Sequence, residues 1–97
     1  MPLSDADIAF AVDLFGELGA LTTRKMFGGM CLYHDGTVFA LQASDARLYL
    51  KTKDPEALFG ERTDQFHNMP YYALPEDMLD DPVAATDAAQ TALKALV

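Results

Sequence analysis

The chain has 97 residues, 51% of them hydrophobic, and a formal net charge of −8 at pH 7. This length and apolar content predict a single ordered domain over residues 1–97, with a hydrophobic core of its own. The acidic balance argues against direct binding to nucleic acid or to anionic lipid, because both depend on lysine and arginine side chains that neutralise phosphates.

The sequence has no feature typical of an exported or membrane-embedded protein. Its one cysteine cannot form an internal disulfide, so nothing indicates an oxidising compartment. Residues 1–5 lack the basic start and apolar run of a signal peptide, and no apolar stretch approaches membrane-spanning length. We therefore expect a cytoplasmic protein.

The first predicted element is a helix that begins at Ser4. Ser4 is a favourable N-cap, Asp7 occupies the reciprocal position of a capping box, and Gly19 suits the position just after the helix. Phe10 and Leu14 lie beside the main apolar stripe, which leaves two interpretations: a wide core-facing surface or a subunit contact. The stripe itself has helical spacing and consists of Ile8, Ala11, Val12, Phe15 and Leu18.

The centre of the chain predicts a three-stranded antiparallel meander over residues 30–34, 37–43 and 47–51. Asp35-Gly36 joins the first two strands and suits a type I′ turn, because both residues tolerate positive φ. The third strand alternates polar and apolar residues, so one face of the sheet is apolar and needs helices to cover it.

Gly28-Gly29 precedes this meander, where a strand pattern is expected to continue. Glycine inside a strand typically marks a bulge, a bend or close approach of another backbone. The alternative is a phosphate-binding loop, but no further glycine, lysine or hydroxyl residue follows at nucleotide-site spacing. We therefore predict a bulge at Gly28-Gly29.

After the meander the sequence predicts short elements. Asp54-Pro55 has the N-cap and first-turn residues of a short helix that ends at Gly60. Residues 61–68 are compatible with an edge strand or a loop. Residues 69–74 predict a strand, and Pro70 places it at the sheet edge because proline cannot donate a ladder hydrogen bond.

The chain is predicted to end in two helical segments. Pro75 begins a helical turn over residues 76–79, and Asp81-Pro82 begins a helix that runs to Val97. The predicted inward stripe of this helix is Val83, Thr86, Ala89 or Gln90, Leu93, and Leu96 or Val97. The order of elements predicts an α+β fold with two layers, in which an antiparallel sheet packs against the N- and C-terminal helices.

The candidate catalytic and metal-ligating residues do not form a recognisable pattern. Cys31 and His34 are three residues apart on one predicted strand, so they point to opposite faces, and His67 lies in the segment without a clear prediction. We therefore expect a buried cysteine, two surface histidines, no metal and no cofactor. The acidic pairs Asp5/Asp7 and Asp80-Asp81 are better explained as helix starts than as acid–base groups.

Five of the seven basic residues fall on or beside the meander, namely Arg24, Lys25, Arg47, Lys51 and Lys53. Arg47, Tyr49 and Lys51 share one face of a strand, where they could form a docking patch for an acidic partner or a small anion. The alternative is a solvated sheet face whose basic residues pair with nearby acids.

Tyr71 and Tyr72 are adjacent aromatic residues, and they too could belong either to the core or to a contact surface. Neighbouring residues on a strand point to opposite faces, so we expect one ring inward and the other outward as a contact anchor.

Several motifs in this order resemble the N-terminal domain family of TfoX, also called Sxy, the regulator of natural competence. The matching segments are TRKMFGG at 23–29, LY at 32–33, DG at 35–36, FAL at 39–41, LYLK at 48–51, MPYYALP at 69–75 and LDDP at 79–82. The resemblance implies a two-layer α/β fold similar to type III secretion chaperones, and such folds often dimerise. The chain ends after the counterpart of this domain's last helix, so we expect only the partner-binding half of the regulator's role.

The resemblance also implies a function without catalysis. TfoX-like regulators act as transcriptional co-activators of competence genes alongside the cyclic-AMP receptor protein. The residues of the family's shared motifs are not an established catalytic site, so the resemblance implies no active site in this chain. We expect a non-enzymatic protein-interaction module that forms a homodimer and contacts its partner through Arg24, Lys25, Arg47, Tyr49 and Lys51, with Tyr71 or Tyr72. The alternative is a small-molecule or anion-binding domain that uses residues 24–29 and Lys51.

Overall fold

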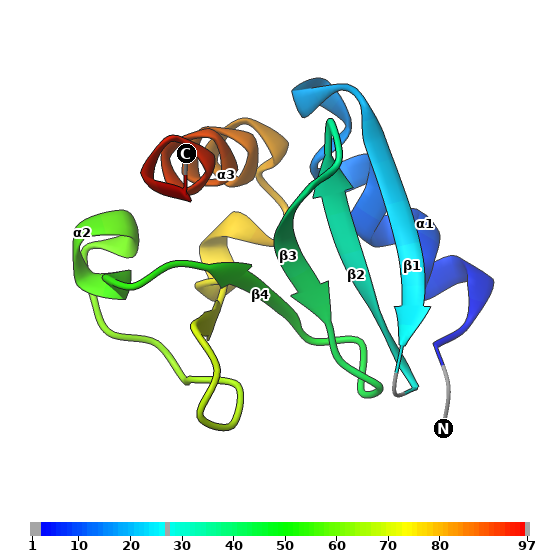
Figure 1. Cartoon of the computed structure of the whole chain (residues 1–97), viewed down its shortest axis with the longest axis horizontal. Coiled ribbons are helices and arrows are strands. Elements are labelled where there is room, and N and C mark those ends of the chain that lie inside the picture. Colours follow the sequence, from blue (N-terminus) through cyan, green and yellow to red (C-terminus); the bar gives the residue numbers. More distant parts are fainter. Residues whose placement is uncertain (1–2, 27, 97) are drawn as a thin grey trace.

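A computed structural model describes residues 3–26 and 28–96 (Figure 1). Its elements follow one another as α1 (Asp5–Leu14), the 3₁₀ turn η1 (Gly16–Leu18), β1 (Leu21–Met26), β2 (Gly29–His34), β3 (Thr37–Gln42), β4 (Leu48–Lys51), α2 (Pro55–Phe59), β5 (Tyr71–Ala73), the 3₁₀ turn η2 (Glu76–Met78) and α3 (Pro82–Leu96). The α+β class predicted from the sequence is confirmed.

The five strands form one antiparallel sheet in the order β1-β2-β3-β4-β5. The predicted meander corresponds to β2, β3 and β4, and β5 lies at the edge, as Pro70 indicated. The opposite edge is β1, which the sequence analysis did not predict. Five of its six residues are exposed, so it lacks the alternating burial that makes a strand recognisable.

Two glycine-containing turns connect the first three strands. Asp35 and Gly36 have φ values of 49° and 82°, so the predicted turn with two positive φ angles is confirmed. The prediction of a bulge at Gly28-Gly29 is wrong, because β1 ends at Met26 and β2 begins at Gly29. The bulge in β2 lies between Leu32 and Tyr33 instead.

Gly29 is needed for a different reason, close approach of another backbone. A Cβ atom added there would lie 2.4 Å from the carbonyl oxygen of Gln42 on β3. Gly28 has a φ of +78°, which glycine adopts without strain. The pair therefore lets the chain turn and then lets β2 lie close against β3.

The predicted helix starts are confirmed by their hydrogen bonds. The Ser4 hydroxyl accepts from the Asp7 backbone N–H, and the Asp7 carboxylate accepts from the Ser4 N–H, each at 3.1 Å. The first helix is shorter than predicted, since α1 ends at Leu14 and Gly19 closes η1 rather than the helix itself. Its end places Phe15 in the core, where its ring packs edge-on against Phe39 at 5.3 Å.

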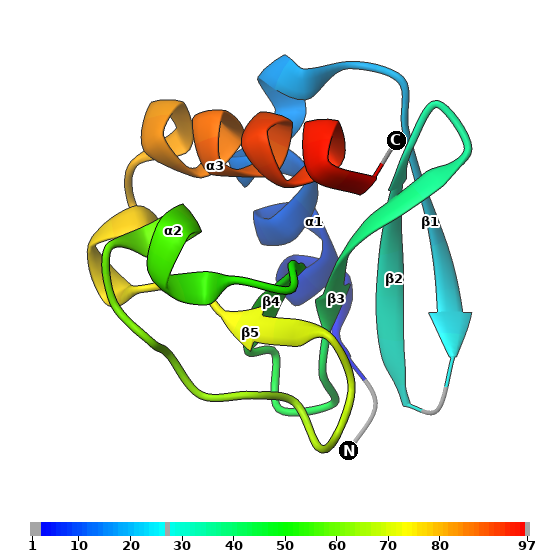
Figure 2. The same cartoon turned by 60° about the vertical axis from the view of Figure 1, so that its left-hand side comes forward.

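The main core lies between one face of the sheet and the helices α1 and α3, which lie on the same side of it (Figure 2). Leu14 belongs to this core, whereas Phe10 is 47% exposed. In the stripe predicted for α3, Val83 is wrong because it is 60% exposed, whereas Thr86, Ala89 (the first of the two alternatives there) and Leu93 are buried as predicted. Alanines at 85, 88 and 92 also face inward, where their small side chains let the helix lie close to its neighbours.

Candidate interaction face

The sheet face turned away from α1 and α3, called here the open face, carries a second apolar cluster. Because residues opposite each other in neighbouring strands point to the same side, the pairs Cys31 with Leu41 and Tyr49 with Ala73 belong to this face. Together with Tyr71 these residues form a buried group that is separate from the main core. No helix covers this group in the described part of the chain, so a different element has to shield it.

Residues 61–70 provide that shield over β4 and β5; residues 61–68 were predicted as either an edge strand or a loop, and 69–70 as the start of a strand. The Phe66 N–H donates to the Tyr71 carbonyl and the Ala73 N–H donates to the Asp64 carbonyl, both at 2.8 Å. The Phe66 ring then packs on Tyr49 with a centroid distance of 5.1 Å. The segment is a loop with one isolated strand bridge, between Gln65 and Tyr72.

The basic residues of the predicted patch are dispersed by this arrangement. Arg24 lies opposite Cys31 and therefore on the open face, whereas Lys25 lies opposite Met30 and on the other side. Arg47 forms an ion pair with Asp64 at 3.0 Å and lies over the Tyr49 ring at 5.6 Å. Its hydrogen bond to Asp64 raises the pKa of Arg47. Arg47 thus follows the alternative interpretation of a basic residue paired with a nearby acid.

The aromatic residues of the predicted patch are not exposed anchors. Tyr49 shares a face with Lys51, as predicted, but it is only 7% exposed because Phe66 covers it. Tyr71 and Tyr72 are both buried, so the prediction that one ring would point outward as a contact residue is wrong. Arg62 covers the Tyr72 ring, with its guanidinium carbon 5.5 Å from the centroid.

A pocket of about 390 Å³ opens on the open face, between β1 and residues 66–69; it is called here the open-face pocket. Buried side chains of Cys31, Leu41 and Tyr71 line its inner part, whereas Met26 and Met69 are 40% and 46% exposed and lie at its mouth. The remaining lining residues are Gly29, Ala43, Ser44, Phe66 and His67.

The inner groups of this pocket are held in their neutral forms. Burial raises the pKa of the Cys31 thiol. Burial also raises the pKa of the Tyr71 hydroxyl, and the nearby Cys31 and Tyr33 raise it further. The Cys31 thiol lies 3.6 Å from the Met26 sulfur and donates to it. Both ionisable groups are therefore protonated near neutral pH, and neither resembles an activated nucleophile.

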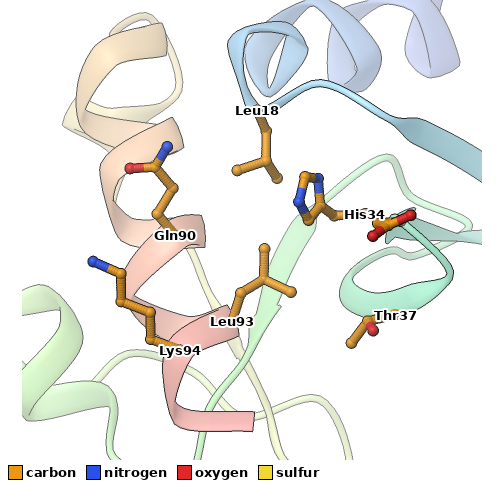
Figure 3. Close-up of a pocket in the computed structure, with 7 residues that line it drawn as sticks. Leu18, His34, Thr37, Gln90, Leu93 and Lys94 are labelled. Atoms are coloured by element: carbon orange, nitrogen blue, oxygen red, sulfur yellow. The ribbon is translucent and has the colours of Figure 1, made fainter. Parts of the chain in front are cut away.

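A second pocket, of about 530 Å³, lies where η1, the β2–β3 hairpin and α3 meet. Leu18, His34 and Leu93 point toward one another there, whereas the Lys94 amine points away from them (Figure 3). The Nδ1 atom of His34 is 2.7 Å from the Gly19 carbonyl oxygen, so one ring nitrogen is engaged by the backbone. This contact ties the hairpin to η1 and gives His34 a structural role.

The three soft metal ligands weighed from the sequence are divided between the two pockets. Cys31 and His67 line the open-face pocket, and His34 lines the other. Within residues 3–26 and 28–96, no group of three histidine, cysteine, aspartate or glutamate residues is arranged to hold a metal ion. In the same part of the chain no helix is both long and apolar enough to cross a membrane.

In a comparison with known families, the model of the TfoX N-terminal domain aligns with residues 13–96. The chain belongs to the TfoX N-terminal domain family. A comparison with curated proteins found no match. The family assignment and the α+β sheet agree with the resemblance inferred from the motifs.

The open-face pocket was not predicted from the sequence. Its lining residues come from β1, β2, β3 with the two residues after it, and residues 66–71, which are distant in the chain. Met26 and Met69 at its mouth were the available signal, since exposed methionines often mark adaptable binding surfaces.

Proposed function

We propose that this domain is a non-enzymatic regulatory module that acts in the cytoplasm through protein contacts, as a transcriptional co-regulator of the competence type. The observation that carries the proposal is the match to the TfoX N-terminal domain over residues 13–96. The uncovered part of the open face supports it, because exposed apolar side chains beside unpaired basic ones are typical of contact surfaces.

The contact surface we propose is the part of the open face bounded by Arg24 and Lys51. Arg24 is exposed and forms no ion pair among residues 3–26 and 28–96. Met26 lies two residues along the same edge strand and is also exposed. A transcription activator such as the cyclic-AMP receptor protein would contact this surface through acidic and apolar side chains. Direct binding to nucleic acid is not expected, because the net charge of −8 opposes it.

We also propose that the domain forms a homodimer. Phe10 supports this proposal, since it is 47% exposed on α1 and would be covered by a partner subunit. Sedimentation equilibrium should give the mass of two chains for the native domain and a shift toward one chain for Phe10→Ser. A native domain that sediments as one chain at all concentrations tested would contradict a homodimer.

The proposed protein contact can be tested by affinity capture from the lysate of the domain's own host. The tested variant is Arg24→Glu with Lys51→Glu, and the matched control is Lys94→Glu, whose side chain belongs to the other pocket. Arg47 is left unchanged, because its reversal would place a like charge beside Asp64.

We expect the native domain and the Lys94 variant to recover a DNA-bound activator or an RNA polymerase subunit, and the double variant to lose it. Melting temperatures of all three proteins should agree closely, because the exposed Arg24 and Lys94 and the half-buried Lys51 form no ion pair among the described residues. Equal recovery by the double variant would reject this contact surface. Failure of the native domain to recover any transcription component would reject the co-regulator proposal.

A further inference from the structure

We propose that the open-face pocket binds a small organic anion with an apolar body, of the class of aromatic carboxylates. This site would give the domain a ligand of its own, beyond its proposed protein contact, and it does not depend on that contact. Three features carry the inference: the lining of the pocket, the neutrality of its inner part and the charge beside its mouth.

The lining suits an apolar body of limited size. The volume of about 390 Å³ falls near the lower end of the range for small-molecule sites, which is roughly 300–1,000 Å³. Leu41, Phe66 and Tyr71 present apolar and aromatic surface to it. A ligand with one or two fused rings can therefore replace water against this surface, and removal of apolar area from water favours its binding.

The inner part of the pocket offers no charge to a ligand. Cys31 and Tyr71 are buried, and burial raises the pKa of both, so they stay protonated. No aspartate, glutamate, lysine or arginine is among its described lining residues. A charged ligand group would lose hydration there without a partner, so it has to remain at the mouth.

At the mouth the charge balance favours an anion, although the protein as a whole is acidic. Arg24 lies on the open face two residues from Met26, opposite Cys31, and makes no ion pair with any other described residue. Ser44 and His67 line the pocket and can donate hydrogen bonds to a carboxylate. None of the 15 acidic residues is among the described lining residues, so a carboxylate meets no like charge in the lining.

The two methionines provide a means of closing the pocket over its ligand. Met26 and Met69 lie at the mouth on different segments, and both are partly exposed. Methionine side chains are unbranched and polarizable, so they adjust to ligands of different shape and make favourable contacts with aromatic rings. An aromatic body therefore suits this pocket better than a purely aliphatic one.

The test uses the purified full chain and two probes with the same ring system, 1-naphthylacetate and the neutral 2-(1-naphthyl)ethanol. We expect 1-naphthylacetate to shift the backbone amide resonances of Met26, Cys31, Ala43 and Tyr71 saturably, with Kd in the micromolar to millimolar range. The neutral alcohol should bind the same residues about three- to five-fold more weakly, because it lacks the charge that pairs with Arg24.

Two variants with controls make the result specific. Ala43→Phe places a ring in the pocket and should abolish the saturable shifts, and Ala43→Leu is a smaller replacement if the first variant does not fold. Arg24→Gln should weaken 1-naphthylacetate about three- to five-fold and leave the neutral alcohol unchanged. Lys53→Gln removes an exposed positive charge that does not line the pocket, and it should change neither affinity.

The proposal is overturned if the native domain shows no saturable shift, or if the shifts centre on the pocket of Leu18, His34 and Leu93. It is also overturned if a folded Ala43→Phe variant binds as tightly as the native domain. Equal affinity for the acid and the alcohol would reject the anionic class. Because these measurements need no protein partner, they can fail or succeed independently of the proposed co-regulator function.

Discussion

Replacement of Gly29 by alanine is the change whose cost follows most directly from the structure. The added Cβ would lie 2.4 Å from the Gln42 carbonyl oxygen, 3.3 Å from the Ala43 Cα and 3.4 Å from the Ala43 carbonyl carbon. All three atoms belong to the backbone of the neighbouring strand and its exit, so no side-chain rotation can relieve the contact. The start of β2 has to move away from β3 instead.

The expected magnitude comes from the cost of overpacking. Extra atoms in a well-packed region typically cost about 1–3 kcal/mol, and we place Gly29→Ala at about 2–3 kcal/mol because the contacted atoms are backbone. In a domain of this size 1 kcal/mol lowers the melting temperature by about 4–8 °C, so the variant should melt about 10–20 °C lower.

Two other glycines serve as matched controls. Gly28→Ala meets only the Ser44 Cβ, at 3.6 Å, but it retains a φ of +78°, so it should cost about 1 kcal/mol from backbone strain alone. Gly16→Ala meets nothing within 4 Å and should stay within about 0.5 kcal/mol of the native protein.

Urea unfolding followed by circular dichroism measures all three variants. The urea concentration at the midpoint should be highest for Gly16→Ala, lower for Gly28→Ala and lowest for Gly29→Ala, and the dependence of the unfolding free energy on urea concentration should not change. A Gly29→Ala variant as stable as Gly28→Ala would show that β2 does not approach β3 as closely as the structure has it, and the argument for Gly29 would be refuted.

Buried groups in the fold should respond to pH and to substitution in characteristic ways. Burial raises the pKa of Cys31 in the folded state, so its contribution to stability is intact below about pH 8.5 and is lost as the pH rises through the folded pKa. In urea titrations, the free energy of unfolding of Cys31→Ala should therefore fall less at alkaline pH than that of the native protein. Phe39→Ala should cost about 3–5 kcal/mol in the same assay, because the ring is fully buried. Gln42→Glu should cost more than about 3 kcal/mol at neutral pH, because the Gln42 amide donates to the Asp7 and Ala46 carbonyls at 3.1 and 3.2 Å, and a carboxylate there cannot donate. Its deficit relative to the native protein should shrink near pH 5 as the new carboxyl group is protonated, and a constant deficit would contradict this assignment.

The elements that could be predicted from the sequence are those fixed by short-range chemistry. The turn at Asp35-Gly36 needs two residues that tolerate positive φ, and the caps at Ser4 and Asp54 need side-chain oxygens that accept backbone N–H groups. Each requirement involves residues within three positions of one another. Their agreement with the structure therefore reflects local rules that tertiary packing did not override.

The features that could not be predicted depend on contacts between distant residues. The first helix ends at Leu14, and the next residue, Phe15, packs on Phe39, 24 positions further along the chain. Strand β1 carries no alternating pattern, because most of its residues are exposed on both faces. Tyr49 alternates like an outward-facing residue, yet Phe66 covers it from a segment that has no regular pattern of its own.

The same dependence on distant contacts explains why the basic patch predicted from the sequence differs from the site in the fold. From the sequence, the basic residues alone defined a patch, since charge can be recognised without knowledge of neighbours. In the fold, Asp64 forms an ion pair with Arg47. Residues 61–70, which bring Asp64 there, also form one wall of the open-face pocket. The segment thus removes one part of the predicted patch and builds a new site beside Arg24. A protein contact there and a ligand in the pocket would use adjoining surface and would share Arg24. Ala43→Phe in the pocket and Lys51→Glu outside its lining therefore separate the two. If 1-naphthylacetate weakens capture of the protein partner by the native domain but not by Ala43→Phe, occupation of the pocket controls the contact.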